Sequence, residues 1–423
     1  MRKWLLFCTT PLMAISLCRA QPADSLSIVD CYTLAEQHYP LVKRYDLIAK
    51  TAAYSLDNLQ KGYLPQFEVN AQASYQSAVT AIPIHLPGVD IPVLSKDQYK
   101  AYAEIDQVLY DGGEIARQKE WQKNNETVAR QELAVDLYQL KDRIDQLFFG
   151  VLLIDGQLKQ NDLLVKDLQL GLDKTQASIK NGTAFRSNAD LISAALLQTR
   201  QHAIELRASR KAYTDMLGLF IGRPVHEYTV LATPAQVIVS DEIKRPELAV
   251  FDAQAKALDV QNQLLTVGTR PRIGVFLQGG YGRPGLDMLD NNFAAYYVGG
   301  IHLSWSPSAF YTLKRKRAQI DIDRREVAVQ KENFLFNTDL TIRQQSSEID
   351  KYRLLSASDD EIVGLREQVK NTAMAQLENG VITGNDFLKE VNDEDQARQN
   401  KWVHYIQLLM AQYKQQTTTG NQP

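Results

Sequence analysis

Side chains that could carry out acid–base, nucleophilic or metal chemistry are dispersed along this sequence of 423 residues. No two histidines have the spacing that places metal ligands on one face of a helix, and no HExxH, P-loop or nucleophile-elbow motif occurs. The stretch Gly279-Gly280-Tyr281-Gly282 is rich in glycine, but it lies in an expected strand and not before a helix, so we expect no phosphate-binding loop there. We therefore expect no enzyme activity, no metal site and no cofactor. The six histidines are His38, His85, His202, His226, His302 and His404.

Two Asn-Gly pairs are the most distinctive polar features of the chain. The pair Asn181-Gly182 precedes Asp190-Leu191-Ile192, and the pair Asn379-Gly380 precedes Asp386-Phe387-Leu388. Glycine is favoured just beyond the C-terminus of a helix, because it adopts the left-handed conformation without strain at Cβ. Each pair is therefore expected to end a long helix at the tip of a helical hairpin. An aspartate near the start of the return helix is also favoured by the helix dipole.

The Asn-Gly pairs belong to a repeat that covers most of the chain. Pro40 and Pro246, and likewise Pro65 and Pro271, are separated by the same number of residues, and both copies continue in the same order. A fixed period of this kind indicates a duplicated structural unit. We divide the chain into a first repeat at 21–222, a linker at 223–244, a second repeat at 245–416 and a polar C-terminal tail at 417–423.

The first 20 residues have the pattern of a secretory signal peptide. Arg2 and Lys3 precede an apolar run, and the segment ends in the small residue Ala20. Leu17 is a poor fit to a lipoprotein signal, so we expect no lipid anchor at Cys18. The formal net charge of the chain is -3, which gives no basic footprint for nucleic acid.

Four segments alternate between apolar and polar residues, and the first of them does so strictly. They lie at about 66–76, from about 99, at 273–281 and at 297–305. Each is about ten residues long, which matches a tilted membrane-spanning strand. The same alternation is typical of a half-buried sheet in a globular protein. Here, however, each strand pair lies between very long helical patterns without a globular core.

The helical patterns are long enough to form a coiled coil. Apolar residues from Leu133 to Leu158 recur at alternating spacings of four and three, which is an unbroken heptad seam. At 1.5 Å per residue, a helix from 114 to 181 spans roughly 100 Å. The expected helices lie at 41–60, 114–181, 190–220, 246–265, 310–378 and 386–413.

Four amphipathic strands cannot close a barrel, and an open sheet in lipid leaves unpaired backbone groups that cost several kcal/mol each. The chain is therefore expected to oligomerise, and three copies supply about twelve strands. We predict an α+β membrane protein with a duplicated unit, in which four transmembrane β-strands per chain contribute to a trimeric 12-stranded barrel. A long α-helical coiled-coil barrel continues it.

This repeated order of elements resembles the TolC family of outer-membrane efflux proteins. The likeness rests on Tyr110-Asp111-Gly112-Gly113 before the first long helix and on Asn379-Gly380-Val381-Ile382-Thr383 before Asp386. The resemblance implies a homotrimeric channel-tunnel in the outer membrane of a Gram-negative bacterium, surrounded by outer-membrane lipid and extended into the periplasm. It also implies a passive exit duct for efflux or type I secretion. A periplasmic adaptor (membrane fusion protein) and an inner-membrane transporter of the RND, ABC or MFS type would be its partners.

The resemblance also implies roles for particular residues. Asp386 matches an aspartate that lines the pore constriction of family members, so it is our candidate for the gate. Where those members carry a second acidic residue one turn further on, this sequence has Lys389. The tips at Asn181, Gly182, Asn379 and Gly380 would meet the adaptor. Tyr75, Tyr281 and Trp305 are candidates for the aromatic belts at the membrane interfaces.

Two other classes of protein share some of these features. A periplasmic adaptor contains a helical hairpin, but it carries one hairpin flanked by small β-domains, whereas this chain has two. A structural coiled-coil protein of the periplasm would account for the helices and leave the four alternating strands unexplained.

Overall fold

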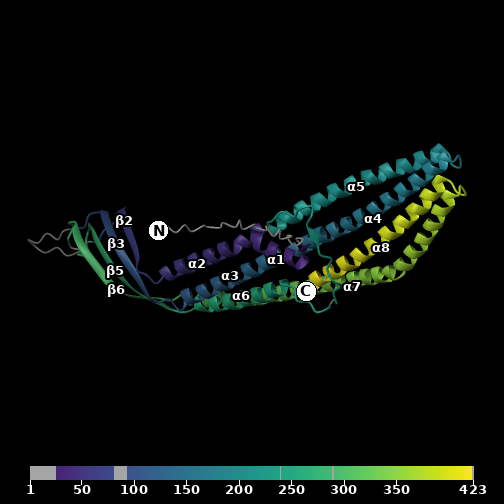
Figure 1. Cartoon of the computed structure of the whole chain (residues 1–423). Helices are drawn as coiled ribbons and strands as arrows, with labels where there is room; N and C mark the ends of the chain where they lie inside the picture. The colour runs from purple at the N-terminus through teal and green to yellow at the C-terminus, as the bar shows by residue number, and fades with distance from the viewer. Residues whose placement is uncertain (1–24, 81–92, 239, 288–289, 422–423) are drawn as a thin grey trace, which may run out of the picture.

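The computed structural model describes residues 25–80, 93–238, 240–287 and 290–421, so the expected signal peptide lies outside the described residues. A four-stranded sheet occupies one end of an elongated molecule, and two helical hairpin tips occupy the other (Figure 1). The elements in chain order are β1 (Ser25–Leu26), α1 (Ile28–His38), the 3-10 helix η1 (Pro40–Lys43), α2 (Arg44–Lys61), β2 (Gln66–Tyr75), β3 (Asp97–Tyr110), α3 (Glu114–Tyr138), α4 (Leu140–Lys180), α5 (Arg186–Ile221), β4 (Val230–Leu231), α6 (Glu247–Val267), β5 (Arg272–Arg283), β6 (Ala294–Ser304), α7 (Ala309–Glu378) and α8 (Gly384–Thr419).

The four alternating segments form one antiparallel sheet in the order β2-β3-β5-β6. Residues directly opposite each other on neighbouring strands project to the same face. Phe67 lies opposite Ile105, Ile105 lies opposite Leu277, and Val275 lies opposite Ile301, so the apolar sides of all four strands merge into a single face. In the single chain this face is exposed. Its large exposed members include Phe67, Val69, Tyr75, Tyr99, Ile105, Leu277, Tyr281, Tyr297, Ile301 and Leu303.

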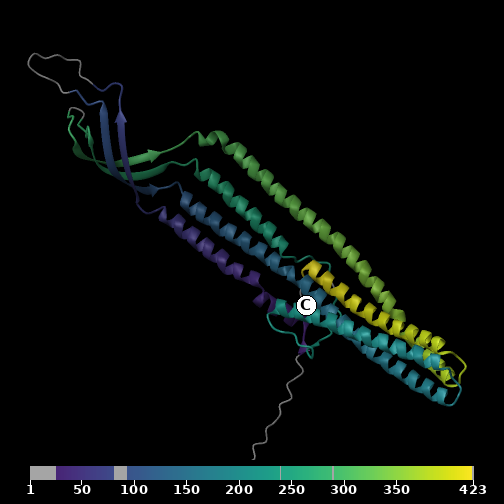
Figure 2. The same cartoon turned by 90° about the horizontal axis from the view of Figure 1, so that it is seen from above.

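The helices next to the sheet keep the order of the strands. α2 packs against α3, α3 against α6, and α6 against α7. Figure 2 shows these four helices side by side below the sheet. The orders agree because α2 leads into β2, β3 into α3, α6 into β5 and β6 into α7. Within the described residues, β2 and β6 each have a neighbouring strand on one side only.

The half of the molecule that ends in the tips is built from two helical hairpins. α4 pairs with α5, α7 pairs with α8, and α4 joins the two hairpins by packing against α8. No helix among the residues that the structure describes is long and apolar enough to cross a membrane.

The expected helix from 114 to 181 is interrupted at Gln139, between α3 and α4. The interruption is slight, since Gln139 keeps right-handed backbone angles and its amide still donates to the carbonyl oxygen of Val135 at 3.2 Å. The heptad seam therefore continues through it, as the buried side chains of Leu137, Leu140 and Ile144 show.

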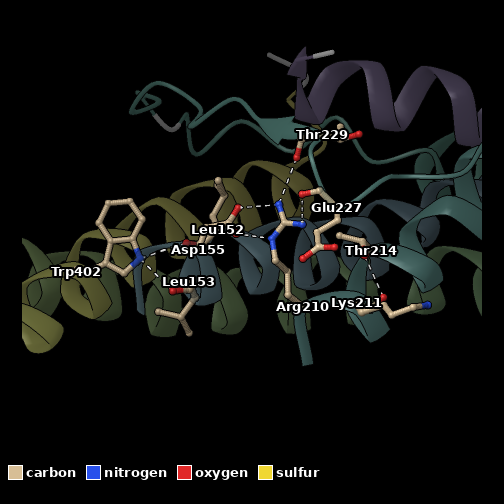
Figure 3. Close-up of polar contacts among 9 residues, drawn as sticks. All are labelled: Leu152, Leu153, Asp155, Arg210, Lys211, Thr214, Glu227, Thr229 and Trp402. Carbon is tan, nitrogen blue, oxygen red and sulfur yellow. Dashed lines mark hydrogen bonds and ion pairs between the residues drawn. The ribbon is translucent and has the colours of Figure 1, made fainter. Parts of the chain in front are cut away.

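The waist of the molecule contains elements that the sequence pattern does not predict. α1 packs against α4 and α5, and β1 pairs in parallel with β4 of the linker. Arg210 of α5 holds this linker in place. Its guanidinium forms an ion pair with Asp155 of α4, and it donates hydrogen bonds to the carbonyl oxygens of Glu227 at 3.0 Å and Thr229 at 3.3 Å (Figure 3). The linker is thus part of the fold and not a free connection.

A second contact at the waist holds α8 against α4. The indole nitrogen of Trp402 donates to the carbonyl oxygens of Leu152 and Leu153, both at 3.2 Å (Figure 3). The ring lies directly over Gly156, where a Cβ atom would overlap it. Only glycine leaves room for this close approach.

The C-terminal boundary differs from the expectation. α8 continues to Thr419, and Thr417 and Thr419 are buried. The backbone amide of Lys244 donates to the carbonyl oxygen of Thr419, which docks this end of α8 on the segment before α6. This corrects the expected polar tail at 417–423, because residues 417–419 belong to the helix.

Candidate functional site

The two hairpin tips have the same backbone geometry. Gly182 and Gly380 adopt the left-handed conformation, with φ of 74° and 69°. The amide of Gly182 donates to the carbonyl oxygen of Ile179 at 3.0 Å, and that of Gly380 donates to Leu377 at 3.1 Å, which closes each helix in the manner of a Schellman motif. A Cβ atom on Gly380 would lie 3.4 Å from the carbonyl oxygen of Thr183. Asn181, Gly182, Asn379 and Gly380 therefore occupy two adjoining turns at one end of the molecule.

Each tip also exposes an apolar side chain that the sequence reasoning missed. Phe185 is 80% exposed and Val381 is 68% exposed. Both residues follow an Asn-Gly pair within three residues. An apolar residue at such a position in the sequence would have indicated an exposed side chain at the tip. An exposed apolar residue at the end of a hairpin gives each tip a small surface for contact with another protein.

Asp386 lies at the start of α8 in a capping box with Thr383. Its carboxylate accepts hydrogen bonds from the Thr383 hydroxyl at 2.7 Å and the Thr383 amide at 3.0 Å, and its own amide donates to the Thr383 hydroxyl. The Thr383 side chain and then its backbone amide lower the pKa of Asp386. The carboxylate therefore stays ionised at neutral pH while it stabilises the start of the helix.

A second carboxylate, Glu390, lies on the same side of α8 as Asp386. Both line a groove of about 530 Å³ between α7 and α8. Glu390 has cationic partners, since the ammonium of Lys389 lies 3.0 Å from its carboxylate and the guanidinium of Arg366 lies 3.7 Å from it. One turn beyond Asp386 the helix therefore carries a basic residue, Lys389, at a spacing of three and an acidic residue, Glu390, at a spacing of four. The sequence reasoning considered the spacing of three and missed Glu390.

Phe387, the middle residue of the Asp386-Phe387-Leu388 motif, has a structural role. Its side chain is fully buried and packs against Gly171 of α4, so the motif directs one side chain outward and the next into the core. A small apolar cluster around Phe387 joins both hairpins. Its buried members are Leu168, Leu172, Ala189, Ile192, Leu196, Ala373, Leu377, Phe387 and Val391.

Charged side chains around the buried Glu394 connect the hairpins beside this cluster. The ammonium of Lys370 on α7 lies 2.7 Å from Asp167 on α4 and 3.5 Å from Glu394 on α8. Glu394 also pairs with Arg398, whose guanidinium lies 3.0 Å from Glu367. Breaking a buried pair by removing one partner costs more free energy than a surface pair contributes, because the other charge remains desolvated. This network therefore fixes α4, α7 and α8 relative to one another.

The three candidate interface aromatics lie at the two ends of the apolar sheet face. Tyr75 ends β2, and Tyr281, near the end of β5, stacks on Phe293 with ring centroids 5.6 Å apart. Trp305 lies at the opposite end, directly after β6, and its indole nitrogen donates to the carbonyl oxygen of Thr269 at 3.0 Å. All three side chains are exposed. Their places fit two separate aromatic levels.

Solved structures share this architecture over almost the whole chain. The outer membrane protein VceC from Vibrio cholerae aligns with a TM-score of 0.66 and 12% identity, over 93% of this chain and 96% of VceC. The CmeC outer membrane channel of Campylobacter jejuni aligns with a TM-score of 0.64 and 13% identity, over 93% of this chain and 85% of CmeC. The MtrE outer membrane channel of Neisseria gonorrhoeae aligns with a TM-score of 0.63 and 12% identity, over 93% and 88%.

No model of a protein family matches the sequence, and no curated protein sequence matches it either. At such low identity, the likeness to solved structures concerns the fold alone. The chain has the fold of these outer membrane channels, which confirms at the level of structure the resemblance to the TolC family of outer-membrane efflux proteins.

Proposed function

We propose that this protein is one protomer of a homotrimeric channel in the outer membrane of a Gram-negative bacterium. The single observation that carries the proposal is the exposed apolar face shared by all four strands, in a sheet where β2 and β6 have no further neighbouring strand among the described residues. A lipid environment covers an apolar face, but it cannot satisfy the backbone groups of an open edge. Joining β2 of one copy to β6 of the next satisfies both requirements.

The helices support the same mode of assembly. On α7, the exposed residues Ile322, Val329 and Phe336 recur every seventh position, and on α2 the exposed residues Leu47 and Tyr54 do the same. These stripes lie on the two outer helices of the row, directly below the two open strands. Two different surfaces that pair head to tail produce a closed ring when the rotation from one copy to the next closes. Nearer the tips, Leu197 and Ile204 on α5 and Ile362 and Val369 on α7 repeat the pattern.

A ring of three copies has the dimensions of a channel. It contains twelve strands, which enclose an aqueous lumen when the apolar face points to lipid and the opposite face points inward. That inward face carries Glu68, Asn70 and Gln72 of β2 beside Glu104 and Lys100 of β3. The helices prolong the lumen, since α7 has 70 residues and spans about 105 Å.

The tip end is the proposed gate and docking site. Three copies of Asp386 at a narrow opening would form an acidic ring that favours cations. Glu390 would add to it to the extent that its pairs with Lys389 and Arg366 leave it negative. The adjoining turns at Gly182 and Gly380, with exposed Phe185 and Val381, would receive a periplasmic adaptor. An inner-membrane transporter of the RND, ABC or MFS type would then deliver substrates for efflux or type I secretion, and this protein would act as their passive exit duct without enzymatic chemistry.

Cell fractionation and reconstitution test the proposal. We expect the protein in the outer-membrane fraction, extracted only by detergent, with a mass three times that of the processed chain. In planar bilayers the purified particle should conduct ions. A water-soluble monomer in the periplasmic fraction would contradict the proposal.

A further inference from the structure

The first turns of α7 carry an unusual run of positive charge. Lys314, Arg315, Lys316 and Arg317 are consecutive, and all four are exposed. The guanidinium of Arg317 donates to the hydroxyl of Thr266 on α6 at 2.8 Å. Within the part of the chain that the structure describes, no ion pair involves Lys314, Arg315 or Lys316. Adjacent like charges repel one another, so an anion outside the chain would stabilise them.

Two aromatic residues lie one helical turn before two of these cations. Phe310 is 51% exposed and precedes Lys314 by four residues, while Tyr311 is 85% exposed and precedes Arg315 by four residues. Residues four apart share one side of a helix. Each aromatic ring is therefore followed, further from the sheet, by a cation on the same side of α7.

The position of these pairs matches the edge of the proposed membrane-spanning sheet. β6 ends at Ser304, Trp305 follows, and α7 begins at Ala309. Lys314 lies about 8 Å along the helix from Ala309. The headgroup layer on each side of a bilayer is about 5 to 8 Å thick, and long basic side chains extend toward it while their aliphatic parts stay on apolar surface.

We propose that the start of α7 binds anionic phospholipid headgroups of the membrane leaflet that faces the periplasm. Phe310 and Tyr311 enter the interface, and the ammonium of Lys314 binds the lipid phosphates. Arg315 lies seven residues before Ile322, so its guanidinium reaches the phosphates at the seam between two copies. Clusters of basic residues next to a membrane-spanning segment bind anionic lipid in this way. The inference rests on the proposed function, because it requires the sheet to span a membrane. In the trimer the three copies form a basic collar below the barrel.

The chain contains a matched control for the two cations. Arg325 is exposed on the same helix, and no ion pair involving it is found among the described residues. It lies about 15 Å further from the sheet than Arg315, which is beyond the headgroup layer. Arg325→Gln thus removes one exposed charge from α7 without touching the proposed lipid site.

The test uses the trimer purified in dodecyl maltoside and titrated with phosphatidylglycerol or with phosphatidylcholine. The shift of the thermal unfolding midpoint gives the half-saturating mole fraction of each lipid. We expect the native protein to prefer phosphatidylglycerol, and less so in 0.5 M NaCl, since salt screens exposed charges. The double variant Lys314→Gln/Arg315→Gln should lower the affinity for phosphatidylglycerol about 25-fold, at about fivefold for each cation. Arg325→Gln should retain the native affinity.

Four results would overturn the lipid site. The first is equal affinity for the two lipids, and the second is a native response in the double variant or an equal loss in Arg325→Gln. The third is the same stabilisation by inorganic phosphate at matched ionic strength, which would assign the cations to a free anion. If the double variant loses its trimeric state in detergent without added lipid, the cations serve contacts between copies and the lipid site is likewise rejected. A conducting trimer without lipid preference would leave the channel proposal standing, whereas a water-soluble monomer would remove both.

Discussion

The ammonium of Lys370 on α7 lies 2.7 Å from the carboxylate of Asp167 on α4, and this ion pair joins the two helical hairpins near their tips. The ion pair of Lys174 and Glu378 joins them as well. The side chain of Lys370 is 11% exposed, and that of its second partner, Glu394, is 4% exposed. Any movement that separates α7 and α8 from α4 must break this contact. The ion pair between Lys370 and Asp167 is therefore positioned to stabilise a closed arrangement of the two hairpin tips.

Lys370→Met should weaken the link between the hairpins. The variant leaves Asp167 and the buried Glu394 with less compensating charge, a change that costs about 3 kcal/mol for a buried pair. We expect a lower thermal midpoint and a larger or less stable conductance in planar bilayers. Arg353→Met is the control, since the Arg353 side chain on α7 is 64% exposed and, among the described residues, pairs only with the exposed Asp350 on the same helix. Similar behaviour of the two variants would show that Lys370 does not hold the tip.

Asp386→Ala should raise single-channel conductance or weaken block by multivalent cations, because it removes one of the two carboxylates in the groove between α7 and α8. Glu390→Gln should act in the same direction, and the two changes together should have the larger effect. Asp386→Ala also removes the capping box and should cost about 1 kcal/mol of stability. Thr383→Ala separates these effects, since it disrupts the same box and keeps the carboxylate. Unchanged conductance and block in the Asp386 variant would exclude it from the gate.

Bulky charged residues at either tip glycine should impair export and leave the trimer intact. Gly182→Arg and Gly380→Arg place a side chain on a left-handed residue, which costs about 1 to 2 kcal/mol, and they obstruct the surface proposed to receive the adaptor. A Cβ atom at Gly182 meets no atom within 4 Å, so Gly182→Ala tests the backbone strain alone. Export should be measured beside cross-linking to the adaptor. Native export by the arginine variants would argue against docking at the tips.

A buried carboxyl at the waist should make stability depend on pH. Asp145 of α4 accepts a hydrogen bond from the Tyr32 hydroxyl of α1 and another from the Thr417 hydroxyl of α8 at 3.4 Å. Burial raises the pKa of Asp145 to about 7, whereas an unfolded aspartate titrates near 4. The folded state thus holds a proton that the unfolded state releases between these two pH values. The stability that this group contributes is fully present below about pH 4 and is lost as the pH rises through about 7.

Asp145→Asn should remove this dependence. The slope that one such proton adds is about 1.4 kcal/mol per pH unit between the two pKa values. Burial also raises the pKa of Asp395, to about 6, but that group is present in both proteins, so the difference between them isolates Asp145. Thermal midpoints of the native protein and the variant should therefore converge or cross between pH 4.5 and 8. Parallel midpoints over this range would contradict the assignment.

The periodic elements of the fold could be predicted from sequence because each follows a repeated pattern. The seam through Leu137 and Leu140 is buried as its heptad spacing predicts, and the alternating segments are strands. β1 and β4 have only two residues each, so they carry no period that a sequence could reveal. The capping of α8 by Thr383 and Asp386 required knowledge of where the helix begins.

Contacts between distant elements could not be predicted in the same way. Lys370 and Asp167 belong to different repeats, and no local pattern indicates that they meet. Glu390 was missed because a spacing of three and a spacing of four both lie about one turn from Asp386, and only the helix geometry shows which residue lines the groove. The merging of four apolar strand sides into one face depends on the register of the sheet.

Disulfide cross-linking between the outer strands tests the shared barrel most directly. Within one chain, β3 and β5 separate β2 from β6, which places these strands about 14 Å apart, too far for a disulfide. Cysteine at Asn70 of β2, scanned against cysteine at positions 296 to 302 of β6 in a Cys31→Ser background, can therefore link only different copies. The account predicts that at least one pair yields covalent dimers and trimers in the membrane and nothing larger. Monomers at every pair, or a ladder that continues beyond three copies, would contradict it.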